Sequence, residues 1–372
     1  MRTEICERFG IDYPIFVFTP SEKVAAAVTR AGGLGVLGCV RFNDADDLEN
    51  VLQWMDANTD GKPYGVDVVM PAKVPTEGSA VDINKLIPQT HRDFVAKTLA
   101  DLGVPPLPAD EDRNEGVLGW LHSVARSHVD VALRHPIKLI ANALGSPPKD
   151  VIDQVHAAGV PVAALAGSAK HAQRHIENGV DIIVAQGHEA GGHTGEIGSM
   201  VLWPEIVDAA GDTPVLAAGG IGTGRQVAAA LALGAQGVWM GSAFLTAAEY
   251  DLGVRSEGGT SVMQDALLAA TSADTVRRRI YTGKPARLLK SRWTEAWDAE
   301  GAPEPLPMPL QNILVSEAHQ RMSESHDPSA IAMPVGQIVG RMNEIRPVAD
   351  IIAELVAGFE AATERLDGIR ES

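Results

Sequence analysis

Short apolar runs and amphipathic stretches alternate through most of the chain. The apolar runs are continuous, and polar residues do not interrupt them at every second position. This is typical of strands buried on both faces of a parallel sheet. Strands of this kind are predicted at residues 14–18, 33–37, 64–70, 137–141, 160–165, 181–185, 213–218 and 237–240. Helical patterns are predicted at residues 22–30, 45–58, 148–158, 169–178, 204–210 and 225–233.

This order of elements predicts an α/β fold. Eight strands that are mostly separated by helices match a (β/α)8 TIM barrel, in which the carboxyl ends of the strands and the loops after them carry the chemistry. A doubly wound sheet is the alternative, because the number of strands alone does not exclude it.

Two segments interrupt the alternation. Residues 71–135 follow the third predicted strand and are expected to form a lid-like insertion at the catalytic face. Residues 251–334 have helical patterns followed by a proline-rich stretch, which predicts a mainly helical subdomain. The barrel is then expected to consist of residues 1–250 and 335–372, with a final helix over residues 348–366 that returns to pack on it.

Composition narrows the function classes. The 372 residues include 31 Lys and Arg against 48 Asp and Glu, which gives a formal net charge of −17. Such a surface repels phosphate backbones and anionic lipids, so nucleic-acid and membrane partners are disfavoured. No apolar run approaches the ~20 residues of a membrane span. Two cysteines and a start without a signal-peptide pattern lead us to expect a cytoplasmic protein.

Three clusters among the 37 glycines fall directly after predicted strands. Gly219 and Gly220 follow the seventh strand, and Gly241 and Ser242 follow the eighth. In a TIM barrel these two loops form the usual phosphate site, because glycine lets main-chain N–H groups approach the phosphate beside a helix N-terminus. Two tight turns are the alternative explanation. Because the clusters fall in consecutive units, we predict phosphate contacts there.

A third cluster, residues 185–195, follows the sixth strand and contains His188 and His193. Its letters resemble the HExxH zinc motif, but the spacing is one residue too long and the glycine pair would break the helix that zinc binding needs. No metal site is therefore predicted. Histidine is a natural general base or hydrogen-bond donor at neutral pH, so both residues are catalytic candidates. A plain polar loop is the competing interpretation for His188.

A basic segment spans residues 277–292. It contains seven Lys and Arg residues and no acidic residue, within an acidic chain. The side chains could pair with acidic neighbours elsewhere, or they could bind an anionic substrate tail, such as the phosphates of CoA or of NADPH. The sequence leaves these two interpretations open.

Residues 164–250 resemble the nitronate monooxygenase family, also called 2-nitropropane dioxygenase-like, and the related FMN-dependent enoyl-acyl-carrier-protein reductase. The motifs that carry the resemblance are residues 189–195, residues 217–221 and the pair Gly241-Ser242. Weaker similarity covers residues 31–35, 64–67 and 336–340.

The resemblance implies a TIM barrel that holds FMN without a covalent bond. By position in the family motifs, the implied FMN-binding residues are Phe18, Thr19, Pro20, Asp67, Gln186, Gly191, Gly192, Gly219, Gly220, Gly241, Ser242 and Gln337. His193 matches the histidine of the family's glycine-rich loop, close to the flavin. The chain departs from the family at residues 18–20, which replace Ala-Pro-Met, and at Asp67, where many relatives carry Asn.

The first hypothesis for activity is the oxidation of alkyl nitronates with O2, with His193 as the base or the substrate-orienting group and His188 as the second candidate. The alternative is an NAD(P)H-dependent flavin reductase of an unsaturated acyl thioester. A third hypothesis is a phosphate-binding TIM barrel without flavin. The expected partners are therefore small molecules, and a homodimer is left open.

Overall fold

A computed structural model describes residues 1–70, 83–107, 122–256 and 258–371. Eight parallel strands form a closed barrel, since the last of them pairs with the first. The barrel strands are β1 (Ile15–Thr19), β2 (Leu34–Gly38), β3 (Gly65–Val68), β4 (Leu139–Asn142), β5 (Val162–Ala166), β6 (Ile182–Gln186), β8 (Val215–Ala218) and β9 (Gly237–Met240). Each overlaps a strand predicted from the sequence. The TIM barrel is confirmed, and barrel closure excludes the doubly wound sheet.

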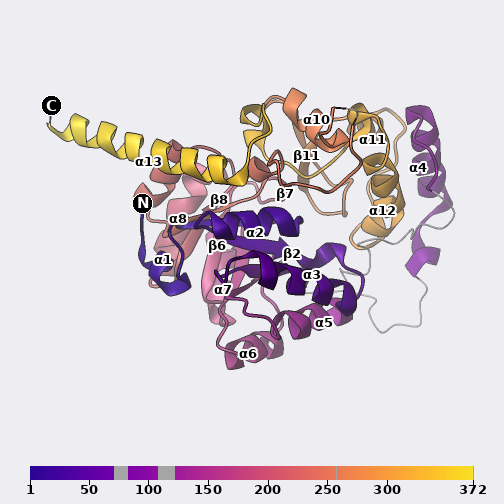
Figure 1. Cartoon of the computed structure of the whole chain (residues 1–372). Coiled ribbons are helices and arrows are strands. Elements are labelled where there is room, and N and C mark those ends of the chain that lie inside the picture. The colour runs from indigo at the N-terminus through magenta and orange to yellow at the C-terminus, as the bar shows by residue number, and fades with distance from the viewer. Residues whose placement is uncertain (71–82, 108–121, 257, 372) are drawn as a thin grey trace.

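Helices cover the outside of the barrel (Figure 1). They are α2 (Glu22–Arg30), α3 (Ala45–Asn58), α5 (His122–Ala132), α6 (Lys149–Ala157), α7 (Ala169–Glu177), α8 (Ser199–Ala210), α9 (Gly224–Ala232) and α13 (Val348–Glu371). The bounds of α2 and α3 are those predicted. Helix α8 begins earlier than expected, and Pro204, which the sequence placed at the helix start, lies inside it.

The barrel strands contribute side chains to two hydrophobic clusters, an inner one inside the barrel and an outer one between the strands and the helices. The inner cluster fills the barrel and contains Phe16 and Trp239, whose stacked rings have centroids 6.5 Å apart. Helix α1 (Glu4–Phe9) adds Ile5 and Phe9 to the same cluster, and the Phe9 ring meets Phe16 edge-on at 5.3 Å. Because α1 lies beside the residues that precede the strands, it covers the amino-terminal end of the barrel. The carboxyl-terminal end is therefore the expected position of the active site.

Helix α10 (Val262–Ala269) contributes Leu267 to a small cluster with Val335 and Ile338. A separate hydrophobic core lies mainly within residues 280–332. Its helices are α11 (Arg292–Asp298) and α12 (Leu310–Ser323). The large side chains Trp293 and Trp297 lie buried at its centre. Short 3-10 helices complete the described chain, at Cys39–Arg41 (η1), Ile83–Leu86 (η2), Ser242–Phe244 (η4), Pro328–Ala330 (η5) and Gln337–Arg341 (η6).

The segment expected to form a lid-like insertion packs partly on this second core and partly on the barrel. Helix α4 (Gln89–Leu102) packs on α11 and α12 and adds Val95 and Leu99 to their core. Helix α5 instead packs on α3 at the barrel surface, in the usual place of a helix between two barrel strands. Residues 71–82 and 108–121 of the expected lid lie outside the described residues.

Residues 251–334 also contain strands that the sequence pattern did not predict. Strands β10 (Thr275–Arg278) and β11 (Ala286–Leu289) form an antiparallel hairpin, and β11 pairs with β7 (Gly192–His193) of the loop after β6. This segment therefore combines helices with a small sheet. The sheet joins the segment directly to the loop that carries the candidate histidines.

Helix α13 returns to the barrel as predicted and packs across α9 and α2 before it extends beyond the body of the molecule (Figure 1). Gly224 lies at the crossing, where an added Cβ would be 2.2 Å from the backbone oxygen of Leu355. Gly358 faces Gly224 across the contact. No helix in the described ranges is long and apolar enough to cross a membrane.

We predict that Gly224→Ala lowers the free energy of unfolding by about 1–3 kcal/mol, since the new methyl overlaps the α13 backbone. The control is Gly368→Ala on the exposed part of α13, where a Cβ meets no atom within 4 Å. Alanine favours helix there, so this variant should gain up to about 1 kcal/mol. Urea unfolding measures both. A Gly224→Ala protein as stable as the wild type would show that the close crossing is not present.

Candidate active site

The predicted site residues meet at the carboxyl-terminal end of the barrel. They lie on β1, β3, β6, β8 and β9 or in the loops just after these strands, with one on the returning segment before α13. Phe18 and Thr19 end β1 and Pro20 follows; Asp67 lies in β3; Gln186 ends β6; Gly191 and Gly192 lie in the loop after β6; Gly219 and Gly220 follow β8; Gly241 and Ser242 follow β9; Gln337 begins η6.

The loop after β8 has a backbone conformation that requires glycine. Gly219 and Gly220 have φ values of 102° and 72°, which side-chain-bearing residues rarely adopt. The side chain of Gln226, in the first turn of α9, holds this loop in place. Its oxygen accepts a hydrogen bond from the Gly222 N–H at 3.0 Å, and its amide donates to the carbonyl of Gly220. The glycine pair is thus fixed just ahead of the α9 N-terminus.

The loop after β9 contacts the returning segment. The N–H of Gly336 donates to Ser242 Oγ at 2.9 Å, and the N–H of Gln337 donates to the Glu189 carbonyl at 2.9 Å. Gly191 allows the backbones to approach, because an added Cβ would lie 2.7 Å from the backbone of Val335. The structure therefore brings together the glycine-rich loop, the Gly241-Ser242 turn and Gln337.

Four backbone donors in these loops make no hydrogen bond within the described part of the chain. They are the N–H groups of Gly219, Gly220, Gly241 and Ser242, all in half-buried residues. A half-buried N–H group needs an acceptor, and grouped N–H donors beside helix starts are a natural anion site. The donor set therefore fits a phosphate group.

The carboxylate of Glu189, to which the sequence analysis assigned no role, links three loops. Glu189 accepts hydrogen bonds at its Oε2 from the Ser199 N–H at 2.9 Å and from the Ser199 hydroxyl at 2.8 Å. The same hydroxyl lies 3.0 Å from the carbonyl oxygen of Gly219. Glu189 thus caps α8 from a distant position, which explains why the helix begins before Pro204. The sequence held no local sign of this cap.

Two arginines of the basic segment hold the same loop from the other side. Arg287 is buried, and its Nε and Nη2 atoms donate to the His188 carbonyl at 3.1 and 3.0 Å. Arg277 donates to the hydroxyl and the carbonyl of Thr194 at 3.0 and 2.8 Å. Main-chain carbonyls that lack partners within the loop are satisfied by these guanidinium groups.

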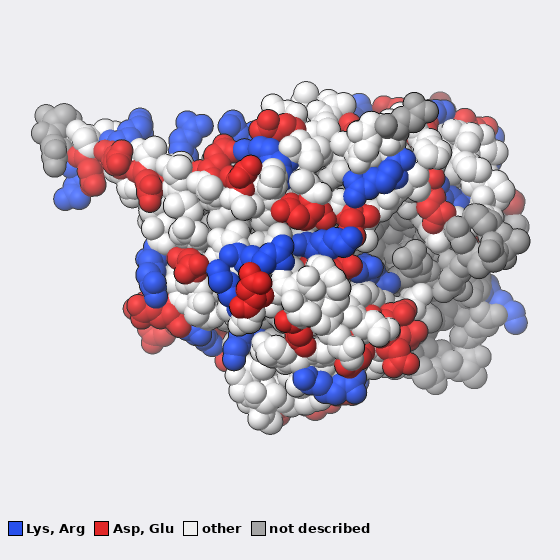
Figure 2. Space-filling view, in the orientation of Figure 1, with Lys and Arg blue, Asp and Glu red and all other residues white. Residues whose placement is uncertain are grey.

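Other cations of this segment pair with acidic neighbours. The pairs are Arg278 with Asp298 at 2.7 Å, Lys290 with Glu295 at 3.8 Å and Arg292 with Asp327 at 3.2 Å. Acidic and basic side chains are likewise interspersed over the face shown in Figure 2. Of the two interpretations of the segment, pairing within the chain therefore describes these three residues.

His193 lies in β7, opposite Ala286 of the hairpin. Its Nε2 is 2.6 Å from the hydroxyl of Thr282, in the turn that joins β10 and β11. Burial, with a smaller effect from the charge of Lys284, lowers the pKa of His193 to about 4. The imidazole is therefore neutral at physiological pH. Thr282 could not be found from the sequence because it lies far along the chain.

His188 is held within its own loop. Its Nδ1 lies 3.2 Å from the Gly195 carbonyl, and its N–H donates to the Ile197 carbonyl at 2.8 Å. It is half-buried and oriented by these contacts. No cluster of three or more His, Cys, Asp or Glu side chains suited to a metal ion occurs among the described residues.

Two polar side chains lie buried at the ends of neighbouring strands. Asn142, which ends β4, accepts from the Met70 N–H at 2.8 Å and donates to the carbonyls of Met70 and Gly145. It therefore fixes the loops after β3 and β4, a role the sequence analysis missed. Asp67 is 2% exposed, and burial raises its pKa to about 8.

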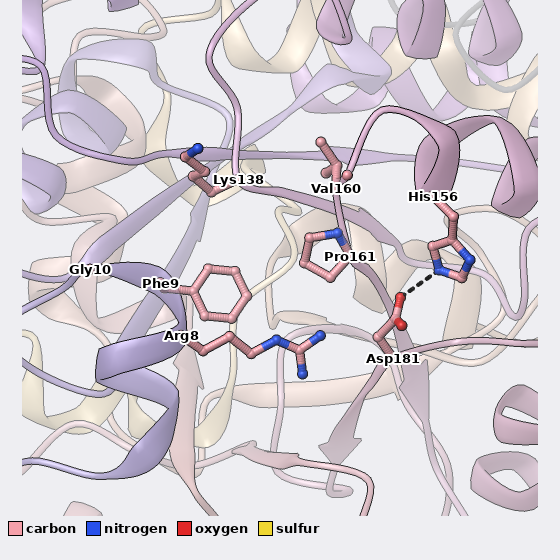
Figure 3. A pocket seen from close by; sticks show the side chains of 9 residues that line it. Arg8, Phe9, Gly10, Lys138, His156, Val160, Pro161 and Asp181 are labelled. Atoms are coloured by element: carbon pink, nitrogen blue, oxygen red, sulfur yellow. Dashed lines mark hydrogen bonds and ion pairs between the residues drawn. The ribbon is translucent and has the colours of Figure 1, made fainter.

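A cavity of about 570 Å³ lies at the opposite end of the barrel, beside α1 (Figure 3). Phe9, Lys138 and Pro161 line it, together with His156 and Asp181, whose Nε2 and Oδ2 atoms are 2.8 Å apart. In TIM barrels this amino-terminal face serves stability. The candidate site is therefore the carboxyl-terminal mouth.

Known proteins are similar to this chain over nearly its whole length. A sequence model described as nitronate monooxygenase matches residues 4–358. A putative monooxygenase of Mycobacterium tuberculosis, Rv1533, is 46% identical, over 99% of both chains. A solved nitroalkane oxidase from Streptomyces ansochromogenes has a TM-score of 0.78 at 27% identity, covering 97% of this chain and 99% of that one. FabK from Thermotoga maritima has a TM-score of 0.74 at 27% identity, over 99% of both chains.

We predict that Glu189→Ala lowers the free energy of unfolding by about 1–3 kcal/mol, because the Ser199 N–H at the α8 N-terminus loses its acceptor and the Ser199 hydroxyl keeps only the Gly219 carbonyl. The matched control is Glu205→Ala on the exposed face of α8, which should change stability by less than about 0.5 kcal/mol. Chemical denaturation compares the two. Equal effects from both variants would argue against the capping role.

Proposed function

The chain belongs to the nitronate monooxygenase family and is an oxidoreductase, and from this premise we propose that it uses FMN to oxidise alkyl nitronates with O2. The observation that carries the proposal is the set of four half-buried N–H donors at Gly219, Gly220, Gly241 and Ser242. They lie at the mouth of the barrel, where a TIM barrel binds the phosphate of its ligand.

The remaining predicted residues are proposed to hold the ring system and the chain between ring and phosphate. Phe18, Thr19 and Pro20 would line one side of the ring, with Asp67 and Gln186 beneath it at the ends of their strands. Gly191, Gly192 and Gln337 would line the opening. When bound, FMN supplies the electron acceptor of the reaction, and the barrel mouth excludes bulk water from it.

His193 is proposed to orient the substrate. A nitronate has already lost its carbon-bound proton, so the oxidation needs no strong base at that carbon. A neutral imidazole whose Nε2 lies 2.6 Å from the Thr282 hydroxyl suits this task, because the contact fixes the orientation of the ring beside the proposed substrate position. The low pKa of His193 favours orientation over proton abstraction. His188 is the second candidate for the same role.

We propose that the two parts of the chain have different roles. We assign FMN binding to the barrel of residues 1–250 and 335–372, and substrate enclosure to the subdomain of residues 251–334. The β7–β11 pairing links the two, because His193 comes from the barrel loop and Thr282 comes from the hairpin. The enclosure of the substrate thus depends on both parts.

A second candidate function is the NAD(P)H-dependent reduction of an unsaturated acyl thioester. The similarity to FabK favours it, at 27% identity over 99% of the chain. The basic segment supports this function less strongly than its sequence suggested. Arg277, Arg278 and Arg287 already bind groups within the protein. Rapid bleaching of the bound flavin by NADPH under anaerobic conditions would favour this function over nitronate oxidation.

We predict that the purified protein is yellow and consumes O2 with a propyl nitronate. His193→Ala should lower kcat by about 10²-fold or more, because the substrate loses its orienting contact. His171→Ala, an exposed histidine on α7, is the matched control and should leave kcat unchanged. An FMN-replete sample that takes up no O2 with nitronate would refute the activity. A colourless protein that cannot be reconstituted would favour a phosphate-binding barrel without flavin.

The pH profile provides a separate test of His193. Its pKa of about 4 means that the neutral form is present above that pH and is lost only as the pH falls through it. We predict that the ratio of wild-type to His193→Ala kcat/KM stays constant between about pH 5 and pH 8. A ratio that changes with a midpoint near pH 6.5 would show that the imidazole titrates like an exposed histidine.

A further inference from the structure

Asp67 points into the interior of the barrel. Its neighbours in β3, Val66 and Val68, belong to the outer cluster between the strands and the helices. An added Cβ on Gly65 would lie 2.9 Å from the Cβ of Leu139, which belongs to the inner cluster. Side chains two positions apart on a strand share a face. The Asp67 carboxyl therefore shares the inward face with Gly65, one residue before the end of its strand.

The space beside this carboxyl is lined by small or apolar groups. In the barrel register Asp67 lies between Gly38 of β2 and Ala141 of β4. An added Cβ on Gly38 would lie 2.9 Å from Cε2 of Phe18, so the Phe18 ring occupies the other side of that position. These two register neighbours and Phe18 therefore supply no polar side chain to the carboxyl.

Within the described part of the chain no cation compensates the carboxyl. Asp67 forms neither an ion pair nor a hydrogen bond with the residues described there, although it is only 2% exposed, and burial is the sole cause of its pKa shift. The nearby titratable side chain is Cys39, just after β2, whose pKa is raised by burial and further by the charge of Asp67, so the thiol stays neutral. Arg41 of η1 acts on Cys39. Desolvation alone sets the pKa of Asp67, which rises to about 8.

We propose that Asp67 holds the cofactor as a neutral carboxylic acid, donating a hydrogen bond to a carbonyl oxygen or ring nitrogen of the flavin, so that one proton controls cofactor affinity. This inference rests on the proposed function. An ionised carboxylate in the same place has no proton to donate, and its charge repels the acceptor atoms of the ring. Loss of the proton therefore weakens binding, whereas an asparagine would donate at any pH.

The direct test is the affinity of the apo protein for FMN as a function of pH, measured by flavin fluorescence. For the wild type we expect constant affinity below about pH 8 and a roughly tenfold loss per pH unit above it, as follows from a one-proton requirement. Asp67→Asn keeps a donor and cannot titrate, so its affinity should not change with pH. Asp67→Ala should bind more weakly than the wild type at pH 6 and should also show no pH dependence.

Two results would overturn the inference while leaving the proposed function in place. One is wild-type affinity that is constant through pH 9.5. The other is an Asp67→Ala protein that loses affinity above pH 8 as steeply as the wild type, which would assign the titration to another group. A wild-type protein that binds no FMN at any pH overturns the proposed function as well.

A measurement on the apo protein tests the neutral acid without any cofactor. Burial penalises the ionised form, so the penalty is absent below the unfolded pKa of about 3.9 and grows until the pH reaches the folded pKa of about 8. The wild type should therefore lose stability relative to Asp67→Asn as the pH rises from 4 to 8. Parallel stability profiles would show that Asp67 ionises freely, against the inference.

Discussion

The loop after β6 is held from several directions by its main chain, and the candidate site depends on this constraint. Arg287 binds the His188 carbonyl, and Gly191 lies against the backbone of Val335. Strand β7 pairs with β11, and Glu189 binds the start of α8. The contacts of Arg287, Gly191 and β7 involve the main chain of the loop, so they fix the path of the chain itself, and the Glu189 side chain adds a link to α8. Side chains on such a loop are preorganised before any ligand arrives.

This constraint joins the two hydrophobic cores into one site. The barrel contributes the glycine loops that fit a phosphate, while the hairpin contributes Thr282 to the histidine that fits a substrate. The basic segment also gains a structural explanation, since Arg277 and Arg287 satisfy carbonyls of the β6 loop. These cations therefore mainly bind groups within the protein. Their presence in an acidic chain can be explained without an external anion.

The barrel could be predicted from the sequence because its signals are local. Continuous apolar runs mark each strand, and the Ser21 and Asp44 caps mark the starts of α2 and α3. The β10–β11 hairpin was missed because its partner β7 is short and lies far along the chain. The cap on α8 was missed for the same reason, since Glu189 precedes the helix by ten residues. Motifs identified the glycines of the candidate site, but only the fold could reveal Thr282, Asn142 and the burial of Asp67.

Comparing the affinities of the apo protein for FMN and for riboflavin tests the central claim most directly. The two ligands share the ring system and differ in the phosphate, which is the group that the N–H donors of Gly219, Gly220, Gly241 and Ser242 are assigned to hold. Losing two hydrogen bonds to a charged group costs about 3–6 kcal/mol, so we predict that riboflavin binds at least 100-fold more weakly than FMN. Equal affinity for the two ligands, or no binding of either, would contradict the assignment of this end of the barrel as a flavin phosphate site.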